Sequence, residues 1–156
     1  MAQSSSASVS NITMGLANLH DAFLQASLQR KYMEQSPVIR EPTAFMVSDR
    51  GRFERVWVAL LYVLVESWQS KQMRPIREYV GTVTSVAELE RVLLEGKRGG
   101  FLARMRETRH YVCHRDKREY WDQGRFGVAG GLKYHIKLHD AFSKVLLAAM
   151  KRRGSE

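Results

Sequence analysis

The sequence predicts an all-α protein, a single bundle of four to five helices. Apolar residues recur at steps of three and four in several segments, as they do on one face of a helix. No segment shows the convincing apolar–polar alternation of a strand, and no strand–helix–strand rhythm or internal repeat is present. A chain of 156 residues can bury a hydrophobic core without disulfides or metals, so one domain is expected.

The first two predicted helices lie before residue 70. The first ends before Pro37, and its apolar stripe is formed by Ile12, Leu16, Leu19, Phe23 and Ala26. Pro37 and Pro42 then predict a loop from Ser36 to Ser48. The second helix begins near Ser48 or Asp49, either of which can cap it. It is apolar around most of its circumference, which predicts a central and buried helix.

The remaining helices are shorter or more polar. The chain is expected to turn at Pro75, and a capping box from Ser85 to Glu88 predicts a short helix that ends near Gly96. A fourth helix is predicted from Phe101 to His114, and a last one over residues 132–151. The charged and glycine-rich stretch between these two helices, residues 115–131, is predicted to be a long loop.

The composition limits the domain boundaries and the location. Residues 1–10 are rich in Ser and Ala and predict a flexible segment, which leaves a domain over residues 11–152 and a tail over residues 153–156. The longest apolar run, Val56–Val65, is about half a membrane span, so no membrane association is expected. The start lacks the pattern of a secretory signal, and the single cysteine, Cys113, fits a reducing compartment. Together these features predict a cytoplasmic protein.

The net charge of +9 is concentrated in one part of the chain. Residues 1–96 hold as many acidic as basic residues, whereas residues 97–156 hold 15 Lys and Arg against 6 Asp and Glu. Such an asymmetric charge favours a polyanionic partner such as nucleic acid, because every neutralised phosphate releases counterions. A solvated basic surface that only aids solubility is the alternative.

One arginine interrupts the apolar stripe of the fourth helix. Arg109 follows Met105 by four residues and precedes Val112 by three, so it lies on the core-facing side. A guanidinium in this place is costly unless it is paired or opens onto a cleft. Two histidines, His110 and His114, follow it within five residues. An arginine that extends to the helix edge beside solvent-exposed histidines would explain the same pattern.

This segment resembles the motif of the HEPN family. Its pattern is an arginine, a polar residue, any three residues and a histidine, and the sequence reads Arg109-His110-Tyr111-Val112-Cys113-His114. The family often carries a buried helix similar to Leu61-Tyr-Val-Leu-Val-Glu66-Ser-Trp68, and a closing helix similar to Leu138-His-Asp-Ala-Phe142. The resemblance covers about residues 50–150.

The resemblance implies a metal-independent endoribonuclease without cofactors, active at a cleft between two subunits of a homodimer. Arg109 would hold the scissile phosphate, His114 would transfer protons, and His110 would orient substrate or motif partner. Arg109 and His114 are five residues apart, about 140° around an ideal helix. They converge on one phosphate if the helix frays at its end or if each subunit contributes one of them.

Two further residues are candidates for a supporting role in this motif. Glu66 could orient Arg109 or His114, and a solvated carboxylate at a helix end is the alternative. Asp116 occupies the position, two residues after the histidine, where some HEPN toxins carry a tyrosine that a partner enzyme modifies. Family members commonly act as toxins or in defence against phage, which implies an antitoxin partner, but Asp116 argues against that mode of control.

Basic and aromatic residues alternate directly after the motif. Basic side chains contact phosphates and aromatic rings stack on unpaired bases, so the segment predicts binding of single-stranded RNA. The RNA-binding candidates are Arg115, Lys117, Arg118, Tyr120, Trp121 and Arg125. A loop that packs its aromatic residues under the bundle is the alternative.

Two other functions stay open from the sequence. The pairs His110/His114 and His135/His139 have the i, i+4 spacing that lets two imidazoles share one ion, so the helices could form a four-histidine metal site. No carboxylate at a matching spacing accompanies them, and His135 and His139 are also typical of buried core histidines. A non-catalytic HEPN-like module that binds RNA or protein is the other alternative.

Overall fold

The structure is a computed structural model, and it describes residues 3–113 and 131–153. This described part is helical throughout apart from its connections, and it contains seven α-helices and one 3-10 turn. In chain order these elements are α1 (Gln3–Gln35), α2 (Pro42–Val47), α3 (Asp49–Gln69), η1 (Lys71–Met73), α4 (Arg74–Val83), α5 (Ala87–Arg98), α6 (Phe101–Cys113) and α7 (Leu132–Arg153). The predicted all-α class is confirmed, whereas the prediction of four to five helices is too low.

Each of the two additional helices has in its first turn a proline that was expected to mark a loop or a turn. Pro42 begins α2, and the side chain of Glu41 caps this helix by accepting hydrogen bonds from the backbone N–H groups of Thr43 and Ala44. Pro75 lies in the first turn of α4. Proline is well suited to this place because the first N–H groups of a helix have no intrahelical partner.

The other helix boundaries agree with the predicted ones to varying degrees. Ser48 caps α3 as predicted, and its hydroxyl accepts a hydrogen bond from the N–H of Gly51 at 3.0 Å. The first helix, α1, already starts at Gln3, so it includes most of the segment expected to be flexible. The predicted capping box is wrong, because Val86 is the N-cap of α5 and Glu88 instead pairs with Lys144 at 2.9 Å.

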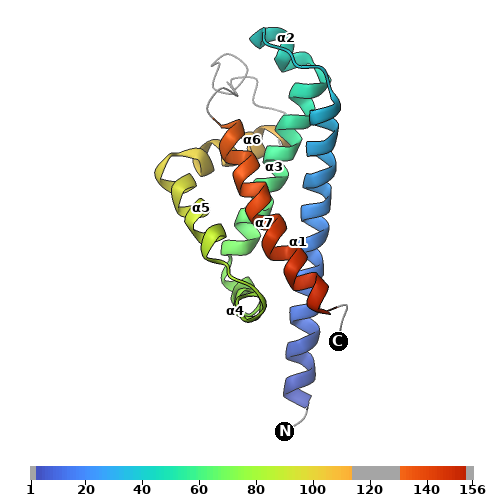
Figure 1. Ribbon diagram of the computed structural model, residues 1–156, viewed down its shortest axis with the longest axis vertical. Coiled ribbons are helices and arrows are strands. Elements are labelled where there is room, and N and C mark those ends of the chain that lie inside the picture. Colours follow the sequence, from blue (N-terminus) through green and yellow to red (C-terminus); the bar gives the residue numbers. More distant parts are fainter. Residues whose placement is uncertain (1–2, 114–130, 154–156) are drawn as a thin grey trace.

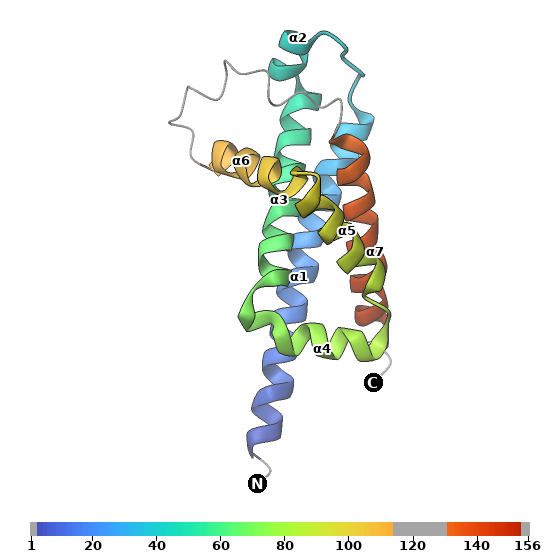
Figure 2. The ribbon, with the colours of Figure 1, turned by 90° about the vertical axis from the view of Figure 1, so that its left-hand side faces the viewer.

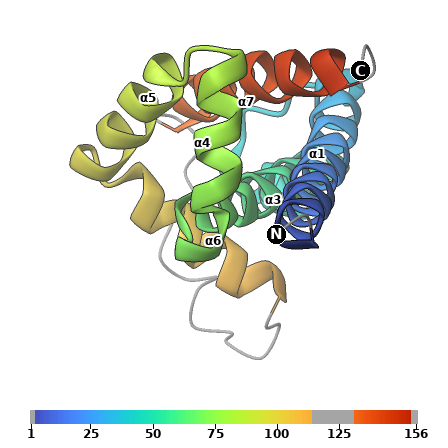
Figure 3. The ribbon, with the colours of Figure 1, turned by 90° about the horizontal axis from the view of Figure 1, so that it is seen from below.

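The long helices α1, α3 and α7 form the body of the bundle (Figures 1 and 2). Helix α3 packs against α1, α6 and α7, as expected from its nearly continuous apolar surface. Helix α4 crosses the lower end of the bundle (Figure 3), while the N-terminal part of α1 extends past it. The largest fully buried side chains of the core include Trp57, Leu61, Leu64, Trp68, Leu138, Phe142 and Leu146.

A glycine turn sets the direction of α6. Gly100 has a φ of 70°, a left-handed conformation that favours glycine, and it ends α5 so that the chain can turn sharply. Phe101 then stacks on Tyr134 of α7 with ring centroids 4.6 Å apart, and Met105 is fully buried. These contacts hold α6 across α3 (Figure 2) and carry its C-terminal end over the bundle surface.

None of the described helices combines the length and the apolar character that crossing a membrane would need.

Candidate functional site

Arg109 lies on the side of α6 that packs toward α3. Met105 is fully buried one turn before it, and Thr108, directly before it, is 8% exposed. The Thr108 hydroxyl donates a hydrogen bond to the carbonyl oxygen of Arg104 at 3.0 Å. The side chain of Arg109 remains 34% exposed, so the guanidinium lies at the boundary between the helix contact and solvent. The structure therefore places the arginine where its position in the apolar stripe predicts.

Glu66 of α3 is the ionic partner of this arginine. Arg109 Nη1 lies 3.5 Å from Glu66 Oε2, and 42% of the Glu66 side chain is exposed. A half-exposed pair at this distance contributes only about 0–1 kcal/mol. Arg109 Nε is buried and has no hydrogen-bond partner among the described residues, which costs about 1–3 kcal/mol. Glu66 thus holds the guanidinium in place, yet the Nε–H group of Arg109 has no hydrogen-bond partner among the described residues.

Two further residues, Tyr62 and Arg106, adjoin this pair. Neither was predicted from the sequence to be part of the site. Burial raises the pKa of the Tyr62 hydroxyl, and the negative charge of Glu66 raises it further. Arg106 and Arg109 act in the opposite direction because they favour the phenolate. Helical spacing could have found both residues, since Tyr62 lies one turn before Glu66 and Arg106 lies three residues before Arg109.

The other motif residues lie at or beyond the end of α6. His110 is exposed on the helix, and Cys113 is exposed and is the last residue of α6 that the structure describes. The predicted proton-transfer residue and the rest of the predicted site lie outside the described residues. These are His114, Arg115, Asp116, Lys117, Arg118, Tyr120, Trp121 and Arg125.

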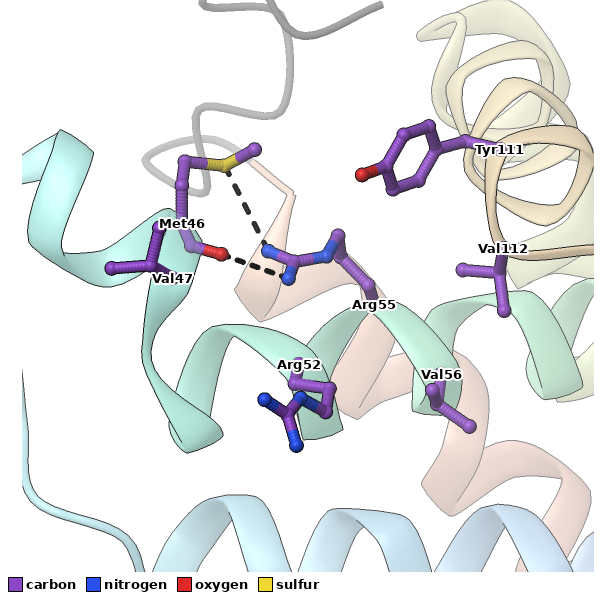
Figure 4. A pocket seen from close by; sticks show the side chains of 7 residues that line it. All are labelled: Met46, Val47, Arg52, Arg55, Val56, Tyr111 and Val112. Atoms are coloured by element: carbon purple, nitrogen blue, oxygen red, sulfur yellow. Dashed lines mark hydrogen bonds between the residues drawn. The ribbon is translucent and has the colours of Figure 1, made fainter. Parts of the chain in front are cut away.

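A groove of about 460 Å³ lies beside the same end of α6, on its other flank. It runs between α6 and the start of α3 (Figure 4) and is lined by Met46, Val47, Arg52, Arg55, Val56, Tyr111 and Val112. Arg55 Nη2 donates to the carbonyl of Met46 at 2.9 Å, and Nη1 lies 3.8 Å from its Sδ. The Tyr111 ring points across the groove toward Arg55 (Figure 4). Burial lowers the pKa of Arg55.

The two histidines of α7 lie against the core, His139 buried and His135 partly buried. Trp57 Nε1 donates to His139 Nδ1 at 3.1 Å, so His139 carries its proton on Nε2. This Nε2 lies 3.3 Å from the Ser27 hydroxyl, which in turn donates to the carbonyl of Phe23. Both nitrogens of His139 are therefore engaged, and burial lowers its pKa to about 4.

These hydrogen bonds weigh against the four-histidine metal site. A metal ligand needs an imidazole lone pair, and the lone pair of His139 already accepts from Trp57. Burial lowers the pKa of His135 to about 4, and its ring lies edge-on to Trp57 with the ring centroids 6.1 Å apart. Among the described residues, no three His, Cys, Asp or Glu side chains gather closely enough to hold a metal ion.

No protein-family model, no characterised protein and no solved structure matches the chain. The fold and the site define an all-helical bundle in which an arginine–glutamate pair and a groove with two arginines flank the end of one helix. The relation to the HEPN family rests on the sequence motif and stays a prediction.

Proposed function

We propose that the protein is a HEPN-like, metal-independent endoribonuclease that cuts single-stranded or loop RNA, with Arg109 and His114 as its catalytic pair. The observation that carries this proposal is the state of Arg109, which lies beside Glu66 with a buried Nε that no described residue satisfies. An arginine that only attracted a polyanion would be cheaper on the open surface, where water satisfies every N–H. A guanidinium fixed at this cost suits a phosphate that must be held in one geometry.

The reaction follows from the chemistry of the two side chains. The ribose 2′-oxygen attacks the neighbouring phosphorus while its proton leaves, and the bond from phosphorus to the 5′-oxygen breaks as that oxygen takes up a proton. The products are a 2′,3′-cyclic phosphate and a 5′-hydroxyl. Arg109 donates parallel hydrogen bonds to the phosphate oxygens as their charge grows, and His114 serves in proton transfer because imidazole titrates near neutral pH. His110 orients the substrate or the motif.

Glu66 supports this role of Arg109 and contacts only part of its guanidinium. Its carboxylate approaches one terminal nitrogen of Arg109 at 3.5 Å, which orients the planar group. The remaining edge of the guanidinium can then face a phosphate. The proposed homodimer brings two motifs to one cleft, so that the histidine of one subunit can act beside the arginine of the other. A small basic protein of this kind suits a toxin or an effector of phage defence.

The test is cleavage of a labelled mixed-sequence RNA in excess EDTA. Arg109→Ala and His114→Ala should each lower the rate by about a hundredfold or more. Arg109→Lys keeps the charge but loses the planar fork, so it should also be severely impaired. Arg74→Ala is the matched control, because Arg74 is 77% exposed on α4 and its ion-pair partner among the described residues is Glu78 of its own helix. Its rate should equal that of the wild type.

Two results would count against the nuclease. If EDTA abolished cleavage by the wild type, the reaction would need a metal and the proposed chemistry would be wrong. If the wild type bound RNA and left it intact, the protein would be a non-catalytic binding module. In that case Arg109→Ala would weaken binding, while His114→Ala would change it little.

A further inference from the structure

The groove on the other flank of α6 carries features of a second binding site. We propose that it binds the phosphate and base of a nucleotide, with Arg55 as the phosphate ligand and Tyr111 as the stacking surface. The inference rests on the proposed function only in naming RNA as the source of that nucleotide.

Arg55 is a half-buried cation with little to neutralise it among the described residues. Its contacts in the groove are the carbonyl and the thioether of Met46, both uncharged, and sulfur is a weak acceptor. None of the ion pairs among the described residues includes Arg55. Its neighbour Glu54 is a poor counterion, because burial raises the pKa of that carboxyl group to about 7. An anion in the groove would supply the missing partner.

Arg52 adds a second cation at the rim. It lies 3.6 Å from Asp49, but 67% of the Arg52 side chain and 73% of the Asp49 side chain are exposed. Such a pair is weak and is easily exchanged for a phosphate, whose oxygens accept bidentate hydrogen bonds from a guanidinium. Both arginines belong to α3 and line the groove, and the guanidinium of Arg52 points away from that of Arg55 (Figure 4).

The rest of the lining suits a nucleobase. Tyr111 presents an aromatic ring to the groove, and Val47, Val56 and Val112 supply apolar walls. Stacking on a tyrosine accepts any base, because every base has a π face. The volume of about 460 Å³ falls within the range of about 300–1,000 Å³ that small-molecule sites occupy.

The groove is distinct from the place of the proposed cleavage. Arg55 and Glu66 are separated by about 16 Å along α3, at 1.5 Å per residue, and the end of α6 crosses between them. The phosphate that we assign to Arg55 is therefore a different one from the phosphate assigned to Arg109. It belongs to a flanking nucleotide of a strand that passes over the end of α6, or to a separate mononucleotide.

The test measures binding under conditions that exclude cleavage. A short RNA with 2′-O-methyl groups lacks the attacking hydroxyl, and adenosine monophosphate represents the separate nucleotide. Arg55→Met should weaken binding about tenfold. Val47 is 70% exposed at the groove, so Val47→Glu and Val47→Lys should leave the fold intact and shift the affinity in opposite directions. Thermal unfolding of every variant checks the fold, since Arg55 also ties α2 to α3.

The outcomes separate the two proposals. Weaker binding with Val47→Glu and tighter binding with Val47→Lys supports the groove whether or not RNA is cut. A response of the oligonucleotide alone assigns the groove to a strand, and an equal response of adenosine monophosphate assigns it to a single nucleotide. If neither probe binds, or if neither Val47 variant changes the affinity, the inference is wrong.

Discussion

Replacing Glu54 by Gln should make the protein lose more stability on acidification than the wild type loses. Glu54 is 5% exposed, and burial raises the pKa of its carboxyl group from 4.5 to about 7. Between these two values the folded protein holds a proton that the unfolded chain has released. The contribution of Glu54 to stability therefore grows as the pH falls from 7 toward 4.5.

The two buried histidines act in the opposite direction. Burial lowers the pKa of His135 and His139 from 6.5 to about 4, so between these values the unfolded chain binds protons that the folded protein does not. Each histidine therefore costs stability as the pH falls below 6.5. One pKa unit corresponds to about 1.36 kcal/mol, so between pH 7 and pH 5 His139 costs about 2 kcal/mol. His135, whose pKa is lowered to the same value, costs about as much, while Glu54 contributes about 2 kcal/mol in favour of folding.

Urea unfolding at pH 7 and pH 5 measures the balance. The buried rings of Trp57 and Trp68 report the transition by fluorescence. In the wild type Glu54 offsets about half of what the two histidines cost, whereas Glu54→Gln leaves the histidines unopposed. The loss of unfolding free energy between the two pH values should be larger in the variant by about 2 kcal/mol. Equal losses in both proteins would refute the assignment of Glu54 as a buried, neutral carboxyl group.

Three other substitutions test the site and the packing. Glu66→Gln should change the free energy of unfolding by less than about 1 kcal/mol. It should lower kcat for RNA cleavage about tenfold with little change in KM, because Glu66 orients Arg109. An unchanged kcat would show that Glu66 is not part of the site. Gly96→Ala should destabilise by about 1–3 kcal/mol, since the added Cβ would lie 1.9 Å from the Tyr134 hydroxyl oxygen. Gly81→Ala is its matched control at an exposed position of α4, where the Cβ meets nothing within 4 Å, and thermal unfolding should show a gain of about 0.5–1 kcal/mol.

Apolar periodicity predicted the helices that bury a continuous face. Helix α3 begins at Asp49 and is central because its apolar residues surround it, and α7 begins at Leu132 as predicted. Helices α2 and α4 were missed for a shared reason. Each is short and has a proline in its first turn, and such a proline looks in sequence like a proline in a loop.

The arginine–glutamate pair could be predicted from the sequence, whereas the groove could not. Arg109 was a candidate because it is a cation within an apolar stripe. Glu66 was a candidate because it follows the apolar run of the helix that α6 covers. The groove depends on how far α6 crosses α3, which brings Tyr111 to Arg55. That crossing is set by the turn at Gly100 and by packing between helices, and no local pattern encodes it.

The most direct test of the proposed ribonuclease reaction removes one hydroxyl group of the substrate. Once the cut position in a short RNA is mapped in excess EDTA, the ribose on its 5′ side is changed to 2′-deoxyribose. The proposed reaction requires the 2′-hydroxyl as its nucleophile, so cleavage at that position should disappear, while the unmodified RNA yields a 2′,3′-cyclic phosphate. Continued cleavage of the deoxy substrate at the same position would contradict the account, because the attacking group would then have to come from water or from the protein.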